Sequence, residues 1–210
     1  MLLSNKITLM RVVLAPVFFV IYMLPDYFPD FFANENAFCI ANGYAWTVPA
    51  LWLVFIISEL SDMFDGMIAR KRNETSDFGK LFDPFADTLM QISCFLCFVL
   101  DGIFPAILFL LVLYRELGIL LLRNMMMKKG IAMGARLSGK IKTVTYIAAS
   151  TIALMAVSIQ SLGVFEFLFP WFKISSQIIF AVSVILAIVS FFDYLAIYRK
   201  TLNPKQTTNH

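Results

Sequence analysis

Two pairs of aspartates in the first half of the chain have spacings that suit metal-assisted chemistry. Asp62 and Asp65 are three residues apart, and Asp83 and Asp87 are four apart. Residues three or four apart lie on the same face of a helix, so each pair presents two carboxylates together. The segment between the pairs is polar and turns the chain back. This pattern predicts that the carboxylates converge at one end of two neighbouring helices.

Such a cluster of carboxylates is unfavourable unless cations compensate for it. A charged residue within a membrane helix costs about 2.5–3.5 kcal/mol on insertion scales, and like charges also repel one another. Arg70 alone cannot balance four anions. Hard divalent cations such as Mg²⁺ or Mn²⁺ take oxygen ligands and leave positions for substrate phosphates. The aspartates therefore predict a site for two divalent ions, as in phosphoryl-transfer enzymes.

The elements that must position these aspartates are membrane helices. The chain of 210 residues is 60% hydrophobic and 15% charged, which is far more apolar than a soluble domain. A bilayer core about 30 Å thick needs roughly 20 apolar residues in each helical span. Windows of that length predict a single all-α domain over residues 1–210 with six transmembrane helices. The windows are approximately 7–24, 45–69, 81–100, 104–123, 141–160 and 174–198.

The basic residues predict how these helices lie in the membrane. Lys and Arg accumulate on the cytoplasmic side of a bilayer, and here they cluster in both tails and around 70–80 and 128–142. Segments 25–43 and 101–103 contain none. We therefore expect a multi-pass protein of the cytoplasmic (inner) membrane, with both termini and the aspartates on the cytoplasmic side. We also expect the first window to be a retained span and not a cleaved signal peptide.

The net charge of +3 fits this topology and an attraction to anionic lipids, and it does not indicate a nucleic-acid partner. Outside the predicted spans there is no stripe of aromatic and basic residues that would favour nucleic-acid binding. Cys94 and Cys97 lie three residues apart within one span. We expect them to be buried as small apolar side chains, and a metal or redox pair is the alternative.

A second charged group has residue types that suit phosphate recognition. Arg115 and Arg123 are two turns apart on one predicted span, and Lys140 and Lys142 begin the next. Arginine binds phosphate oxygens as a planar fork, and lysine binds them as a point charge. These cations predict a pocket for a phosphate-bearing acceptor, with snorkelling at the membrane boundary as the alternative for the lysines. Glu116 adjoins Arg115, and adjacent helix positions do not face one another, so we expect no ion pair between them.

The aspartates belong to a longer pattern that includes two glycines, an alanine and an arginine. At all eight positions this pattern resembles the signature of the CDP-alcohol phosphotransferase family. The resemblance implies that family's six-helix membrane fold, a homodimer, and transfer of a phosphoryl group from a CDP-linked donor with two divalent ions. The pattern runs Asp62-x2-Asp65-Gly66-x2-Ala69-Arg70-x8-Gly79-x3-Asp83-x3-Asp87.

The resemblance also implies a role for each position of the signature, residues 62–87. The first three aspartates mainly bind the two metal ions. Asp87 completes the metal site and is the proposed general base. The CDP-linked donor lies over the small residues, with the arginine near its phosphates. The implied donor-binding residues are Asp62, Gly66, Ala69, Arg70 and Gly79.

Further resemblance points to one branch of the family, which transfers a phosphatidyl group from CDP-diacylglycerol to glycerol 3-phosphate. The segments NKITLMR at 5–11, YRELGILLLR at 114–123 and GKIKT at 139–143 are similar to parts of that branch. The cations of segment 115–142 agree, since serine or choline as acceptor would not require them. Thr88 is a departure, because that branch is expected to have Lys after the last aspartate.

Other functions remain open at this point. Within the same family the acceptor could be inositol phosphate, serine or choline. A cation-binding transporter could use the same aspartates as an ion site. Transporters commonly contain inverted repeats with corresponding interrupted helices, and this sequence has no such repeat.

Overall fold

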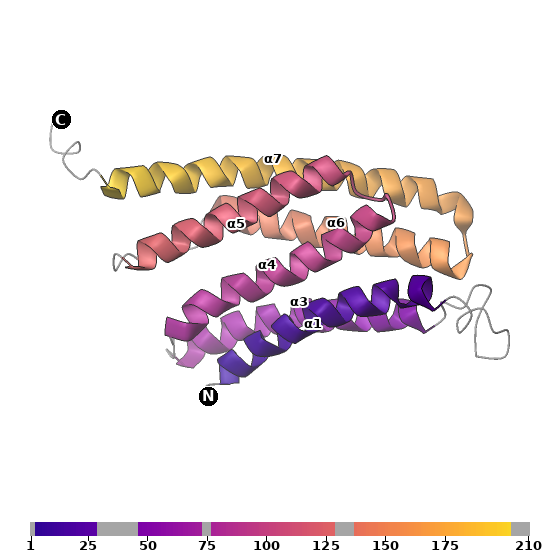
Figure 1. Cartoon of the computed structure of the whole chain (residues 1–210), viewed down its shortest axis with the longest axis horizontal. Helices are drawn as coiled ribbons and strands as arrows, with labels where there is room; N and C mark the ends of the chain where they lie inside the picture. Colours follow the sequence, from indigo (N-terminus) through magenta and orange to yellow (C-terminus); the bar gives the residue numbers. More distant parts are fainter. Residues whose placement is uncertain (1–2, 29–45, 73–76, 129–136, 203–210) are drawn as a thin grey trace.

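Helices account for nearly all of the backbone in the computed structural model (Figure 1). The structure describes residues 3–28, 46–72, 77–128 and 137–202, without the side chains of 3–6, 62–72, 77–81, 137–138, 140 and 200–202. None of the described residues forms a strand, so the predicted all-α class is confirmed. The elements are α1 (Leu3–Tyr27), α3 (Thr47–Arg72), α4 (Asp77–Leu100), α5 (Ala106–Lys128), α6 (Leu137–Leu162), the short 3₁₀ helix η1 (Glu166–Leu168) and α7 (Phe169–Leu202).

Each predicted span corresponds to one of the six long helices of the described residues. The helices are longer than the windows because backbone hydrogen bonds continue through polar residues at their ends. Within the described residues, α1, α4, α6 and α7 are the four helices long and apolar enough to cross a membrane. The described apolar segment of α3 is Thr47–Ser61, and charged residues lie within α5. The chain is thus a multi-pass membrane protein, and both less apolar helices carry candidate site residues.

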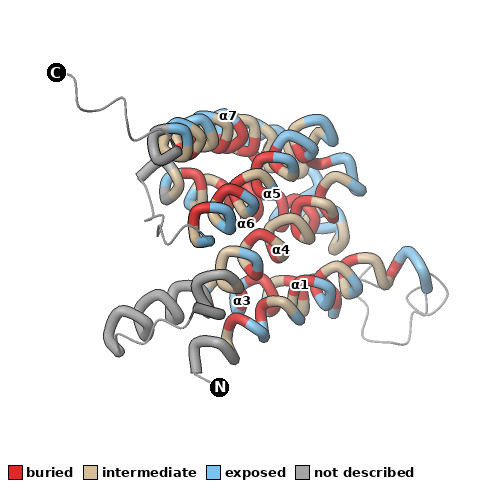
Figure 2. The backbone as a smooth tube through the Cα atoms, turned by 60° about the vertical axis from the view of Figure 1, so that its left-hand side comes forward, coloured by how far each residue is buried: buried red, intermediate tan, exposed pale blue. Residues whose placement is uncertain are grey.

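The helices form two groups (Figure 1). Helix α1 packs against α3 and α4, and α7 packs against α5 and α6, while α4 also contacts α5 and α6 and so joins the two groups. Buried residues face the neighbouring helices, and exposed residues lie on the outer sides (Figure 2). Many exposed residues are large and apolar, such as Leu53, Ile107 and Ile185. Lipid tails are as apolar as these side chains, so such an outer surface suits a bilayer.

An aromatic cluster joins the two groups at the end of α4 that is farther from Asp83 and Asp87. The rings of Phe104 and Phe180 stack with centroids 4.1 Å apart, and Phe95 meets Phe180 edge to face at 5.0 Å. The chain turns from α4 into α5 at Gly102, whose φ of 64° favours glycine. This turn corresponds to the predicted outer connection at 101–103.

Small residues allow α7 to lie close to its neighbours. Ser176, Ser183 and Ser190 are seven residues apart and fully buried. On α5, Gly118 faces Phe191, and a Cβ atom at Gly118 would lie 2.8 Å from a carbon of that ring. Small interface residues permit this close approach of membrane helices. The close packing brings the charged residues of α5 next to the backbone of α7.

The two cysteines of α4 lie in the interior of the bundle. Cys94 and Cys97 are both buried free thiols, which confirms the predicted burial. They pack with the surrounding apolar side chains of the core.

Candidate active site

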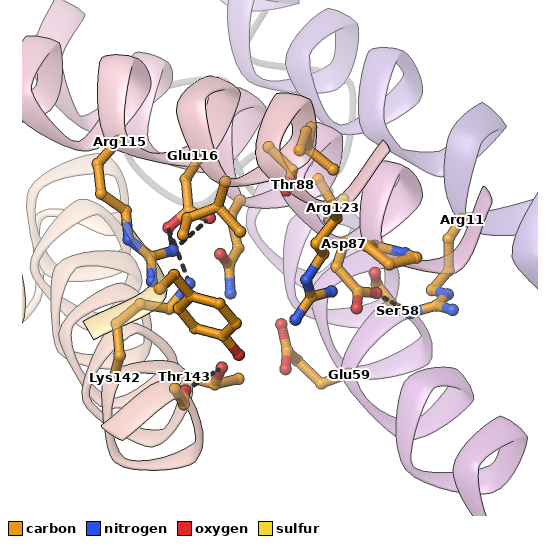
Figure 3. Close-up of a pocket in the computed structure, with 17 residues that line it drawn as sticks. Arg11, Ser58, Glu59, Asp87, Thr88, Arg115, Glu116, Arg123, Lys142 and Thr143 are labelled. Carbon is orange, nitrogen blue, oxygen red and sulfur yellow. Dashed lines mark hydrogen bonds and ion pairs between the residues drawn. The ribbon is translucent and has the colours of Figure 1, made fainter. Parts of the chain in front are cut away.

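A cavity of about 200 Å³ lies between the two groups of helices (Figure 3). Helices α1, α3 and α4 form one wall, and α5, α6 and α7 form the other. Both predicted groups of charged residues contribute to it, although they lie far apart in the sequence. Its charged lining residues are Arg11, Glu59, Asp87, Arg115, Glu116, Arg123 and Lys142.

Asp83 and Asp87 both accept hydrogen bonds from α1. Thr8 Oγ1 donates to Asp83 Oδ1 at 2.5 Å, and Arg11 Nη1 donates to Asp87 Oδ1 in an ion pair. Both donors are buried, and they lie three residues apart on one face of α1, as the aspartates four residues apart do on α4. The shared face predicted for Asp83 and Asp87 is therefore observed. The side chain of Asp87 is still 40% exposed, so this carboxylate remains accessible from the cavity.

The other half of the predicted aspartate cluster lies largely outside the described residues. Helix α3 ends at Arg72 and α4 begins at Asp77, so the short covalent connection keeps these two helix ends near one another. The convergence of all four carboxylates stays a prediction. The predicted site residues whose side chains are not described are Asp62, Asp65, Gly66, Ala69, Arg70, Gly79 and Lys140.

The described carboxylates have donor chemistry that fits a hard divalent cation. Asp83 and Asp87 offer oxygen ligands from adjacent turns of one helix, and such ions prefer carboxylate oxygens. The buried guanidinium of Arg11 beside Asp87 shows that this position already requires a compensating positive charge. Within the described residues, no group of three metal-binding side chains occurs. The remaining ligands of a metal site would have to come from outside that set.

The cations of α5 and α6 meet at Glu116, and the prediction that Arg115 and Glu116 form no ion pair is wrong. Arg115 Nη1 donates to both carboxylate oxygens of Glu116 at 2.9 Å, and Lys142 Nζ donates to Oε1 at 2.8 Å. Adjacent helix positions do point their Cβ atoms in different directions. The long side chains of Arg115 and Glu116 nevertheless bend into one buried gap between three helices. Exposed fractions are 7% for Arg115, 5% for Glu116 and 7% for Lys142. Lys142 is therefore buried and paired, so the snorkelling alternative does not describe it.

Arg115 also fixes α5 to α7. Its Nε donates to the carbonyl oxygen of Ala187 at 3.0 Å, and its Nη2 donates to Ser190 Oγ at 3.1 Å. All three nitrogens of the guanidinium thus donate to protein acceptors. The residue lies in the cavity wall as predicted, but its position is set by α7 as much as by α5.

Arg123 has different surroundings. Its guanidinium lies 5.9 Å from the ring centroid of Tyr194, and its Nε is buried without a hydrogen-bond partner among the described residues. Figure 3 shows the side chain directed into the cavity, toward the region between Asp87 and Glu59. A buried guanidinium nitrogen without an acceptor is costly. Arg123 is therefore the cation of this group best placed to receive an anion.

Several lining residues were not predicted as site residues from the sequence. Glu59, Glu116 and Arg11 line the cavity, and each carries a charge within a predicted span. A charged residue inside a membrane span is a candidate functional residue in its own right, so this signal was present in the sequence. Thr88, which departs from the branch pattern, is buried and also lines the cavity.

Comparison with known proteins agrees with this arrangement. The family model described as CDP-alcohol phosphatidyltransferase matches residues 1–189. A CDP-diacylglycerol–glycerol-3-phosphate 3-phosphatidyltransferase of Treponema pallidum is 34% identical over 199 residues, which cover 93% of this chain and 88% of the relative. The enzyme of that name from Bacillus subtilis is 30% identical, with 92% and 93% covered. A probable phosphatidylglycerophosphate synthase of Mycobacterium tuberculosis is 27% identical, with 92% and 80% covered.

These matches run through the aspartate helices and the cationic helices alike. The family model ends within α7, so it includes every residue named above as a predicted site residue. The relatives are similar over nearly their whole length and not over a short motif. With an all-helical membrane fold and the complete aspartate signature, the chain belongs to the CDP-alcohol phosphatidyltransferase family.

Proposed function

We propose that this protein transfers the phosphatidyl group of CDP-diacylglycerol to glycerol 3-phosphate, forming phosphatidylglycerophosphate and CMP. The observation that carries the proposal is the cavity with Asp87 on one wall and the cations of α5 and α6 on the other. An acceptor with a hydroxyl at one end and a phosphate at the other suits this polarity. The relatives from Treponema pallidum and Bacillus subtilis are named for this transfer.

The cationic wall favours an acceptor that carries a phosphate. Arg123 and Lys142 offer N–H donors to the phosphate oxygens, and Arg115 adds positive charge behind them. Lys140 is proposed as a further contact from the start of α6. Serine and choline carry no phosphate and would leave the buried Nε of Arg123 without an acceptor, at a free-energy cost.

Asp87 is proposed as the general base. Its carboxylate accepts the proton of the C1 hydroxyl, and that oxygen attacks the β-phosphorus of CDP-diacylglycerol. The bond from this phosphorus to the bridging oxygen breaks, and CMP leaves with the electron pair. Arg11 holds Asp87 Oδ1 and fixes the direction of the carboxylate. A base must lie within hydrogen-bond reach of the proton it removes, so this positioning contributes to the rate.

The signature assigns the donor and the ions to the cytoplasmic ends of α3 and α4. Gly66, Ala69 and Gly79 leave room for the CDP group, and Arg70 lies near its phosphates. Two Mg²⁺ or Mn²⁺ ions, when bound, would neutralise negative charge on the donor pyrophosphate, as expected for phosphoryl transfer. The proposed metal ligands are Asp62, Asp65, Asp83 and Asp87.

The proposal includes a location and an assembly. The protein lies in the cytoplasmic membrane with both termini and the site on the cytoplasmic side, because the basic residues cluster at those ends. CDP-diacylglycerol then approaches from the inner leaflet, and glycerol 3-phosphate from the cytosol. A homodimer is proposed from the family resemblance.

The experiment measures CMP release by the purified protein from CDP-diacylglycerol with Mg²⁺. Glycerol 3-phosphate, inositol phosphate, serine and choline are offered in separate reactions. Release with glycerol 3-phosphate alone is the expected result. Release only with another acceptor would keep the aspartate chemistry and contradict the acceptor assignment. No release with any acceptor would contradict the transferase function and favour a cation-binding protein.

A further inference from the structure

Among the described residues, Glu116 is the only acidic residue that is buried. Its carboxylate is buried where α5, α6 and α7 meet, and it accepts hydrogen bonds from two cations on different helices. Neither the proposed proton transfer nor the proposed metal site uses this residue. A buried carboxylate that served packing alone would be a costly choice, because an apolar pair of similar volume is often at least as stable.

The two cations bound to Glu116 differ in their freedom to move. Arg115 is fixed, because its Nε and Nη2 also donate to Ala187 and Ser190 on α7. Lys142 has a flexible stem, and its partners among the described residues are Glu116 and the ring of Tyr146, whose centroid lies 4.7 Å from Nζ. Glu116 therefore links the ammonium group of Lys142, at the end of its flexible stem, to the fixed guanidinium of Arg115.

We infer that Glu116 is a positioning residue, which holds Lys142 in the cavity wall so that its ammonium group is already oriented for the phosphate of the acceptor. The inference rests on the proposed function, because it concerns the phosphate site of that reaction. A lysine ammonium has three N–H donors, and the single bond to Glu116 leaves others for a ligand. A donor that is held before the ligand arrives loses less conformational entropy on binding.

Arg123 provides an internal contrast. It lines the same cavity, but it contacts the ring of Tyr194, and among the described residues no hydrogen bond links it to Glu116. If Glu116 acts through Lys142, its removal should affect acceptor binding only while Lys142 is present. Its effect should be independent of Arg123. Double-mutant cycles measure this distinction directly.

The test compares Glu116→Gln in three backgrounds: the natural chain, Lys142→Met and Arg123→Met. In the natural chain we expect the KM for glycerol 3-phosphate to rise about tenfold, with kcat and the donor KM changed less than about twofold. In the Lys142→Met background the same substitution should change the acceptor KM by less than about twofold, and in the Arg123→Met background by the full tenfold. An unchanged or lower acceptor KM in the natural chain would overturn the inference, as would a full effect without Lys142.

Two further variants keep the inference testable if Glu116→Gln fails to fold, since it leaves two buried cations without their carboxylate. The pair Glu116→Gln with Lys142→Met removes one charge of each sign and should match Lys142→Met alone in acceptor KM. Glu116→Asp keeps the charge but shortens the side chain, and it should raise the acceptor KM without changing the donor KM. A higher acceptor KM in the double variant than in Lys142→Met would contradict a role through Lys142.

The same cycle can be measured without turnover, by calorimetric binding of inorganic phosphate to the purified protein. This separates the two proposals. If the natural chain releases no CMP with glycerol 3-phosphate, the proposed function fails, while the phosphate cycle still tests Glu116. If the natural chain is active and phosphate binding does not depend on Glu116 through Lys142, the inference alone fails.

Discussion

The two walls of the cavity balance their charges in opposite ways. On the wall of α1 and α4, Asp83 and Asp87 each accept a hydrogen bond from the other helix, and Asp87 remains accessible. On the wall of α5, α6 and α7, a buried carboxylate binds two cations, and these three side chains are almost fully excluded from solvent. The acidic wall therefore keeps an accessible carboxylate, where we propose that metal ions and substrate bind, whereas much of the cationic wall is paired within the protein.

The largest effect is expected on the acidic wall. Asp87→Asn should fold and bind the donor but lose turnover by about 10²–10⁴-fold, because the amide cannot accept the acceptor's proton. CMP release and donor binding measure the two properties separately. Asp101→Asn is the matched control, since Asp101 is a carboxylate just beyond the other end of α4 that accepts from Tyr22. Near-normal turnover of Asp87→Asn would remove Asp87 from the role of base.

A smaller effect on turnover is expected at Arg11, the partner of Asp87. Arg11→Lys keeps a positive charge but loses the planar fork that directs the carboxylate. We expect kcat to fall about tenfold, with the acceptor KM changed little, because the loss concerns the reacting geometry. Steady-state kinetics with both substrates checks this split. A rise in acceptor KM at constant kcat would show that Arg11 acts in acceptor binding. The two walls would then not differ in the kinetic step that they affect.

On the cationic wall the expected change is in binding. Arg123→Met should raise the acceptor KM about tenfold or more and change kcat by less than about threefold. The reason is that a hydrogen bond from a charged group contributes about 1.5–3 kcal/mol to binding. Thermal unfolding of this variant should stay close to that of the natural chain, since the contact of Arg123 with another helix is a single ring contact at 5.9 Å from the Tyr194 centroid. Lys142→Met should behave similarly. Unchanged acceptor KM values in both variants would contradict the phosphate pocket.

The smallest effect is expected where the cationic wall is supported by packing. Gly118→Ala places a Cβ atom against the ring of Phe191 and should lower the free energy of unfolding by about 1 kcal/mol. Thermal unfolding in detergent measures the change. Gly118→Ala combined with Phe191→Leu should recover most of the loss. Destabilisation that persists in the double variant would show that the contact with Phe191 is not its cause.

The sequence was sufficient for the parts of the structure that depend on local patterns. Hydropathy windows located the six long helices, and helical spacing predicted that Asp83 and Asp87 share a face. Such features depend on residues within one or two turns of one another. Arg115, Arg123 and Lys142 line one cavity, as predicted from their positions on two spans that follow one another in the sequence.

Sequence reasoning was less successful where side chains from distant helices meet. The ion pair of Arg115 with Glu116 was missed because its geometry depends on α7, which supplies Ala187 and Ser190 as further acceptors. The pairing of Arg11 with Asp87 depends on how α1 packs against α4. Neither contact leaves a periodic pattern in the sequence. Charges within apolar spans indicate that such partners exist, but not which helix provides them.

The bond between Arg11 and Asp87 has a consequence for how the protein is made. The two residues are separated by 76 positions, so Arg11 is synthesised well before the helix that carries Asp87. Until α4 has been inserted, this guanidinium lacks its native carboxylate, and an isolated charge within a span opposes membrane insertion. We expect docking of α1 against α4 to offset this cost, because it gives the buried guanidinium its carboxylate partner.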